Sequence, residues 1–213
     1  MNVENGGRRL LARGRIKAII GEDGVEVLEI GGKRFEGFDG YVPVPLRDLR
    51  YVRVGDIPEG VLIEPVEAVE GNTVYLASLG TRLPFELHYW HGGVNVELAL
   101  WPGDWDEYVS PKAYMEGLSY VLGVLEEWGF IEDLDDEYTG DMYHLSFNMP
   151  LPGSITLLKS LRMVKRFIRE VEEAATQIAV NLALLEIRKR AGRSYSIEEL
   201  LERLDEILGR YGV

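Results

Sequence analysis

Residues 154–191 read SITLLKSLRMVKRFIREVEEAATQIAVNLALLEIRKRA, and this stretch decides the expected fold. Apolar side chains recur in it every three or four residues, without Gly or Pro, at Leu157, Leu161, Val164, Ile168, Val171, Ala175, Ile178, Leu182 and Leu185. This spacing predicts one long α-helix with a coiled-coil-like seam, and Ser154 is placed to cap its first turn. At 1.5 Å per residue the helix would be about 57 Å long, so we expect part of it to contact another helix or another copy of the chain.

The two halves of this predicted helix differ in character. The first half carries a basic stripe, which consists of Lys159, Arg162, Arg166 and Arg169. The stripe is a candidate extension of a surface that binds nucleic acid or a partner, or it pairs with the acidic segment of a neighbouring subunit. The second half, residues 174–187, has almost no polar face, and a helix that is apolar on all sides is buried on all sides. We therefore expect the first half to pack on a sheet of its own chain and the second half to enter a bundle between subunits. After Gly192, an S-x-x-E capping box at residues 196–199 starts a last helix that can fold back as a helical hairpin.

The amino-acid composition limits the classes of protein to which this chain can belong. The 213 residues are 46% hydrophobic, which suits one large domain or two small ones. The absence of cysteine excludes disulfides, thiolate chemistry and cysteine-ligated zinc. No apolar run is long enough to span a membrane and the first residues lack a signal-peptide core, so we expect a cytoplasmic protein with no membrane contact. One glutamine and 28% charged residues favour a thermophilic source.

Charge is unevenly distributed along the chain. The net charge of −13 divides into −3 for residues 1–80, −12 for residues 81–150 and +2 for residues 151–213. An acidic middle argues against a protein that coats nucleic acid with its whole surface, but it leaves room for a local basic face.

The first 80 residues read as short strands separated by turn signals. Gly31-Gly32 fits a two-residue hairpin loop that places Glu29 opposite Arg34, and residues 61–77 contain a second hairpin. The stretch Tyr41–Val44 is expected to be extended, with prolines at positions 43 and 45. Prolines in a strand favour a position at the edge of a sheet. Strands this short and regular predict a small β-barrel of the OB or SH3-like kind.

A basic face lies on the first strand of that predicted barrel. Arg13, Arg15 and Lys17 share one side of the strand because side chains alternate. Small barrels bind single-stranded nucleic acid when such a face also carries aromatic residues. The more common alternative is a solvated strand face whose cations pair with nearby carboxylates.

The middle of the chain predicts a β-hairpin around Gly92-Gly93, a helix from Ser110 to Trp128, an acidic loop over Glu132–Asp141 and a strand over Met142–Met149. The hairpin register pairs His88 with Glu97. It assigns Phe85, Leu87, Tyr89, Val96, Leu98 and Leu100 to the core.

Three tryptophans belong to this region. Trp90, Trp101 and Trp105 lie on or beside the polar face of the hairpin and are candidates for an aromatic binding platform. Coverage by the protein's own elements is the more common alternative.

One candidate catalytic group follows from the same register. If the last strand joins the hairpin in one sheet, His144 shares a face with His88 and Glu97. Two imidazoles and a carboxylate can hold a metal or move protons. A cross-strand His–Glu pair without catalysis is the more common alternative. We expect no cofactor, and the loop acids lack the spacing of a calcium loop.

The expected architecture is α+β in three parts. Residues 1–80 form the small β-barrel-like domain, residues 81–153 an antiparallel sheet plus helix, and residues 154–213 the long helix with the helical hairpin, which serves oligomerisation. The chain contains no P-loop, dinucleotide-binding, zinc-protease or nucleophile-elbow motif.

Three kinds of function remain open. The first is a non-catalytic homo-oligomeric interaction protein, which binds single-stranded nucleic acid or an acidic protein partner through the basic barrel face. The second is a metal-dependent hydrolase that uses His88, Glu97 and His144. The third is a structural assembly subunit without a ligand.

Overall fold

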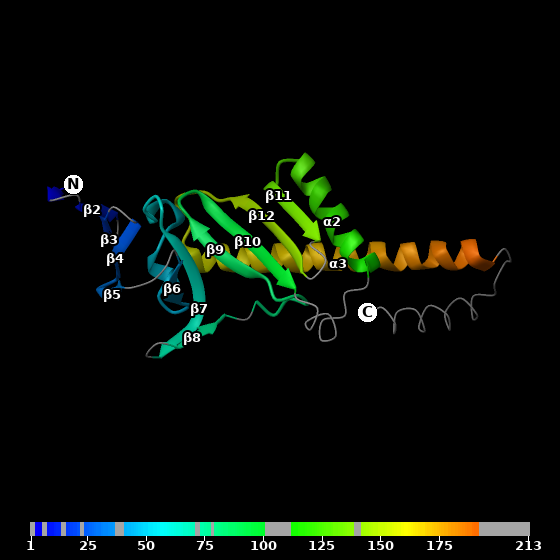
Figure 1. Cartoon of the computed structure of the whole chain (residues 1–213), viewed down its shortest axis with the longest axis horizontal. Coiled ribbons are helices and arrows are strands. Elements are labelled where there is room, and N and C mark those ends of the chain that lie inside the picture. The colour runs from blue at the N-terminus through cyan, green and yellow to red at the C-terminus, as the bar shows by residue number, and fades with distance from the viewer. Residues whose placement is uncertain are drawn as a thin grey trace.

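The computed structural model describes residues 3–5, 8–13, 16–21, 24–36, 41–70, 73–77, 79–100, 112–138 and 142–191. Over these residues the fold is mixed α+β, with two sheets and the helices α2 (Lys112–Glu127) and α3 (Leu157–Ala191). The smaller sheet lies at the end that holds the N-terminus, and α3 runs along one face of the larger sheet and beyond it (Figure 1). No described helix combines the length and apolar character needed to cross a membrane.

The smaller sheet is a five-stranded antiparallel meander. Its strands follow chain order: β1 (Val3–Asn5), β2 (Arg8–Arg13), β3 (Ile16–Gly21), β4 (Gly24–Ile30) and β5 (Lys33–Glu36). The predicted turn at Gly31-Gly32 is confirmed, with Glu29 opposite Arg34. Both turn glycines have positive φ, 58° and 89°, a conformation that residues with a Cβ rarely adopt.

The prediction of an N-terminal β-barrel is wrong. Within the described strands, β1 and β5 lie at opposite ends of the smaller sheet and do not pair, so the sheet is open. The remaining strands that were assigned to the barrel instead join the larger sheet. Hairpins follow from local turn signals, but closure of a barrel requires pairing of its first and last strands, which no local pattern specifies.

The larger sheet has seven described strands and draws them from both sides of residue 80. Their order is β11-β12-β10-β9-β7-β6, and β8 pairs with β7. The strands are β6 (Tyr41–Pro45), β7 (Leu62–Glu70), β8 (Thr73–Leu76), β9 (Glu86–Trp90), β10 (Gly93–Leu100), β11 (Glu132–Tyr138) and β12 (Tyr143–Pro150). As its prolines predicted, β6 is an edge strand, and it pairs with β7 in parallel.

The β9–β10 hairpin has a register two residues away from the predicted one. Tyr89 pairs with Val94 instead of Val96, and the turn is His91-Gly92. Gly93 belongs to β10, where an added Cβ would lie 2.5 Å from the carbonyl oxygen of Met149. Because side chains alternate with period two, this shift leaves every residue on its predicted face.

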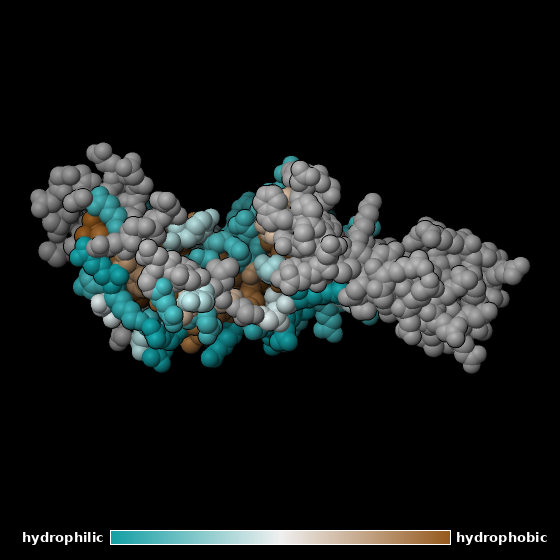
Figure 2. Space-filling view, turned by 60° about the horizontal axis from the view of Figure 1, so that its bottom comes forward, coloured by the Kyte–Doolittle hydropathy of each residue, from teal (hydrophilic) through white to brown (hydrophobic). Residues whose placement is uncertain are grey.

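The core lies between the larger sheet and the helices. The inner sheet face carries Leu87, Tyr89, Val96 and Leu98, all buried, and the ring of Phe147 lies 6.2 Å from that of Phe167 on α3. The same core continues into the smaller sheet through Ile16, Ala18, Leu28 and Ile30. Among the coloured residues on the face in Figure 2, most are hydrophilic, with hydrophobic residues recessed between them.

Helix α3 matches the predicted seam from Leu157 to Ala175, after which Ala179 is buried and the predicted Ile178 is only half-buried. The buried positions are Leu157, Leu161, Val164, Ile168, Val171, Ala175 and Ala179. Thr156, rather than Ser154, caps the first turn, since its Oγ1 accepts a 3.4 Å hydrogen bond from the amide of Lys159. The predicted last helix and helical hairpin lie outside the described residues.

Two expectations for the middle of the chain were wrong. The acidic stretch from Glu132 is the edge strand β11 instead of a loop. An edge strand can carry many carboxylates because its side chains stay in contact with solvent. Trp128, predicted to lie in the buried stripe of α2, is 70% exposed and packs edge-on against Phe130.

Candidate functional site

The candidate site lies on the outer face of the larger sheet, opposite α3. His88 is on β9, Glu97 on β10 and His144 on β12, and these three strands are neighbours. In the β10–β12 register His144 pairs with Ala99 and Ser146 pairs with Glu97. The structure therefore brings together the three residues that the sequence singled out.

The Glu97 carboxylate lies between the two imidazoles. Its Oε1 is 3.3 Å from His144 Nε2 and its Oε2 is 3.6 Å from His88 Nε2. Two further carboxylates approach the same rings: Asp135 Oδ2 is 3.6 Å from His144 Nδ1, and Glu86 Oε2 is 3.9 Å from His88 Nε2. The arrangement surrounds two titratable rings with negative charge.

The two histidines differ in burial. His88 is only 6% exposed, although it faces away from α3, because the Tyr41 ring covers it at 4.5 Å between ring centres. His88 Nδ1 is buried and has no hydrogen-bond partner among the described residues. The His144 side chain is 25% exposed and so remains accessible to water.

Sequence reasoning missed Tyr41, Glu86 and Asp135 as parts of this cluster. Asp135 lies in the stretch that was interpreted as a loop, and Tyr41 reaches the site from the far edge of the sheet. The alternation of the hairpin did place Glu86 on the face of His88. This alternation was the only sequence signal that pointed to any of these three residues.

Chemically, the arrangement is suited to proton transfer. A carboxylate that orients an imidazole is a recurring part of general acid–base sites. Among the described residues, no group of three His, Asp or Glu side chains has the geometry of a metal site.

The predicted basic residues divide into two groups. Lys17 is exposed and pairs with Glu29 at 3.0 Å. Arg13 lies in β2 but its side chain is outside the described part of the chain, as is all of Arg15. On α3, Lys159, Arg162, Arg166 and Arg169 are all exposed, and Arg166 pairs with Glu170 at 2.8 Å.

Of the three candidate platform tryptophans, Trp90 is half-buried and packs over its own turn. A Cβ added to Gly92 would lie 2.9 Å from the Trp90 ring. This packing explains why the sheet tolerates Trp90 on its polar face. Trp101 and Trp105 lie outside the described residues.

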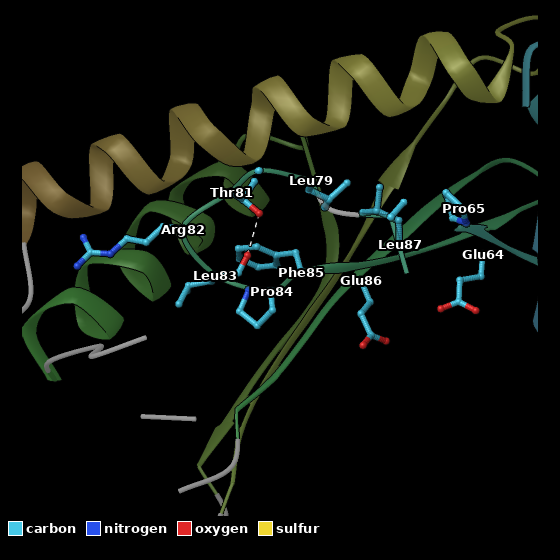
Figure 3. A pocket seen from close by; sticks show the side chains of 12 residues that line it. Glu64, Pro65, Leu79, Thr81, Arg82, Leu83, Pro84, Phe85, Glu86 and Leu87 are labelled. Atoms are coloured by element: carbon cyan, nitrogen blue, oxygen red, sulfur yellow. Dashed lines mark hydrogen bonds between the residues drawn. The ribbon is translucent and has the colours of Figure 1, made fainter. Parts of the chain in front are cut away.

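A cavity of about 320 Å³ adjoins the histidine cluster. It is lined by Glu64 of β7, by the connection that runs from Leu79 to Phe85, and by the start of β9 (Figure 3). Glu86 belongs to both features, because it lines the cavity and approaches His88.

Glu172 of α3 fixes the connection that forms one wall of the cavity. Its two carboxylate oxygens accept hydrogen bonds from the backbone amides of Arg82, at 2.9 Å, and Leu83, at 2.8 Å. Burial raises the pKa of Glu172 above its ordinary value, and these two hydrogen bonds oppose the rise. The Arg82 guanidinium lies 4.6 Å from the centre of the Tyr114 ring.

No protein-family model matches this sequence, and no curated protein matches it. The fold and the site by themselves define an α+β protein with an acidic, histidine-containing sheet face and a long helix.

Proposed function

We propose that this chain is a non-catalytic, oligomeric interaction protein that assembles through residues 174–187 of α3, here called the apolar segment. The observation that carries the proposal is the reach of α3. In Figure 1 its C-terminal part continues past the larger sheet and past α2, and no described helix or strand lies beside its end. The sequence there is mostly apolar, with Thr176, Gln177, Asn181 and Glu186 as its only polar residues.

A second copy of the chain is the expected partner for the apolar segment. One antiparallel helix covers a single stripe of its neighbour, about a third of the circumference. The predicted helix after residue 196 would therefore leave much of the apolar segment uncovered. Ala175 and Ala179 are already buried in the core of this chain, whereas Ala174 is an exposed small residue that allows close approach of a helix from a second copy.

The test is solution mass, measured by light scattering on the full chain. We expect an oligomer for the natural sequence and a loss of mass to the monomer for the double variant Leu182→Glu, Leu185→Glu. The matched control, Lys159→Glu with Met163→Glu, places two carboxylates at exposed positions on the first half of α3 and should keep the oligomer. A monomeric natural protein would overturn the proposal.

The stripe of Lys159, Arg162, Arg166 and Arg169 supports a second element of the proposal, an acidic partner. The stripe lies on exposed positions of the helix half that packs against the sheet, so it stays accessible when the apolar segment is covered. This surface replaces the barrel face that the sequence predicted, because the described N-terminal strands form an open sheet.

Acid–base enzyme function is the second candidate, and the position of Glu97 between His88 and His144 favours it. Its test is a panel of nitrophenyl ester and phosphate substrates. Turnover that disappears in Glu97→Ala and His144→Ala would support an enzyme. Equal rates in the natural and variant chains would remove this candidate.

A further inference from the structure

The cavity opens where two neighbouring strands separate. Within the described strands, β7 and β9 share one Cα pair, Ile63 with Tyr89. Beyond that pair, β7 turns to β8 on its antiparallel side, and the connection from Leu79 to Phe85 spans the gap. The resulting volume of about 320 Å³ lies at the lower end of the range for small-molecule pockets, about 300–1,000 Å³.

The walls and the rim of the cavity differ chemically. Leu79, Leu83 and Phe85 are buried apolar side chains that contribute to its walls. Two carboxylates, Glu64 and Glu86, line it as well, and Figure 3 shows both on the side of the sheet that faces away from α3. An apolar wall beside a pair of like charges is complementary to a ligand with an alkyl body and a positive group.

The cation that lines the cavity does not neutralise this pair. Arg82 stacks on Tyr114, and Figure 3 shows its side chain directed away from Glu64 and Glu86. His88 is the ring nearest to Glu86, at 3.9 Å, and it also approaches Glu97 at 3.6 Å. One imidazole is thus shared among several carboxylates.

The surroundings of Glu64 also disfavour its negative charge. Burial raises the pKa of Glu64 above its ordinary value; His88 opposes the rise, and the neighbouring charge of Glu86 adds to it. A bound cation would offset both the burial of this carboxylate and its repulsion from Glu86.

We propose that this cavity binds an aliphatic cation, meaning an amine or guanidinium group on an alkyl chain. The alkyl chain contacts Leu79, Leu83 and Phe85, and the charged group binds at Glu64 and Glu86. The cation belongs either to a free small molecule or to a basic side chain of a protein. The inference is independent of the proposed assembly through α3.

Calorimetric titration of the full chain with agmatine, which has a guanidinium and an amine on a butyl chain, tests the proposal at low salt. We expect saturable binding to one site per chain. Glu64→Gln with Glu86→Gln should weaken it by at least about tenfold. The control Glu70→Gln removes an exposed carboxylate from the same strand, β7, and should leave the affinity unchanged.

Two further ligands complete the experiment. Butyrate keeps an alkyl chain but carries a negative charge, and it should not bind. A blocked arginine peptide distinguishes the sources, since binding of this peptide without agmatine assigns the site to a protein side chain. Binding of neither cation, or equal binding to the natural and the double-variant chains, overturns the proposal. Circular dichroism checks folding, which these neutral substitutions of the same size should preserve.

Discussion

At the residue scale, Glu172 is a buried carboxylate with two backbone partners. It is 7% exposed, and it joins α3 to the connection between β8 and β9 through two backbone hydrogen bonds. Sequence reasoning had no means to find it, since a single glutamate beside an apolar seam is indistinguishable from a solvated one. What identifies Glu172 is the approach of a segment some 90 residues away.

We predict that Glu172→Ala destabilises the protein by about 2 kcal/mol or more, because one buried and one partly buried amide donor lose their acceptor. Glu172→Gln keeps one acceptor oxygen and should cost less. Urea denaturation, followed by circular dichroism, measures both free energies of unfolding. Glu173→Ala, at the exposed neighbouring position, is the control and should change stability little.

Glu172 also predicts a pH dependence. Its pKa is raised in the folded protein, so the native state binds its proton more tightly than the unfolded chain does. The stabilising contribution of that proton is fully present below the ordinary carboxyl pKa of 4.5 and is lost as the pH rises through the raised value. The stability difference between the natural chain and Glu172→Gln should therefore shift against the natural chain as the pH rises through this window. A difference that is constant with pH would contradict this prediction.

At the element scale, the packing of α2 on α3 depends on a missing side chain. A Cβ added to Gly117 would lie 2.7 Å from the backbone oxygen of Ala175, whereas a Cβ at Gly123 of the same helix meets no atom within 4 Å. Helical periodicity places Gly117 beside the apolar stripe of α2 and Gly123 on the opposite side of the helix. The approach of the second helix shows how little space is left at Gly117.

We predict opposite effects of alanine at these two positions. Gly123→Ala should stabilise the protein by about 1 kcal/mol, because alanine is the better helix former. Gly117→Ala should destabilise it, since forced separation of the helices costs about 1–3 kcal/mol and exceeds the same gain. Thermal unfolding of the two variants checks the signs, and a stabilised Gly117→Ala variant would refute the close-contact explanation.

The β9–β10 hairpin shows which features of an element are local. Alternation assigned every residue to its face, so the sheet face of His88, Glu97 and His144 was predictable. The pairing was wrong by two residues because two adjacent glycines offer alternative turns, and the choice between them depends on β12. There the carbonyl of Met149 leaves no space for a side chain at position 93.

At the scale of the whole molecule, the charges of α3 and of the sheet are separated. The exposed basic stripe of α3 and the acidic outer face of the sheet lie on different layers of the fold, although the net charge is −13. A chain that is acidic overall can therefore still present a local basic surface.

We predict that a short single-stranded oligonucleotide binds this stripe at low salt and dissociates as salt rises. Arg162→Glu with Arg169→Glu should weaken binding and lower the slope of log affinity against log salt by about one per lost phosphate contact. Fluorescence anisotropy measures both quantities. The control Glu126→Lys with Glu127→Lys changes exposed charges on α2 and should not weaken binding. Absence of binding by the natural chain would leave an acidic protein as the only partner of the stripe to test.

The sequence by itself determined the features that depend on neighbours in the chain. Periodicity defined most of the α3 seam, glycine pairs located the β4–β5 and β9–β10 hairpins, and alternation defined the faces of β9, β10 and β12. Each of these rests on the fixed geometry of helices and strands, so a few residues suffice to specify it.

Only the tertiary structure decided how these elements combine. It showed that the N-terminal strands form an open sheet rather than a barrel, that β6 pairs in parallel with β7, and that the acidic stretch is an edge strand. It also placed Tyr41 on His88 and Glu172 on the connection beside the cavity. These outcomes depend on contacts between residues that are distant in sequence, and their energies are set by the closeness of packing between elements, which no local pattern encodes.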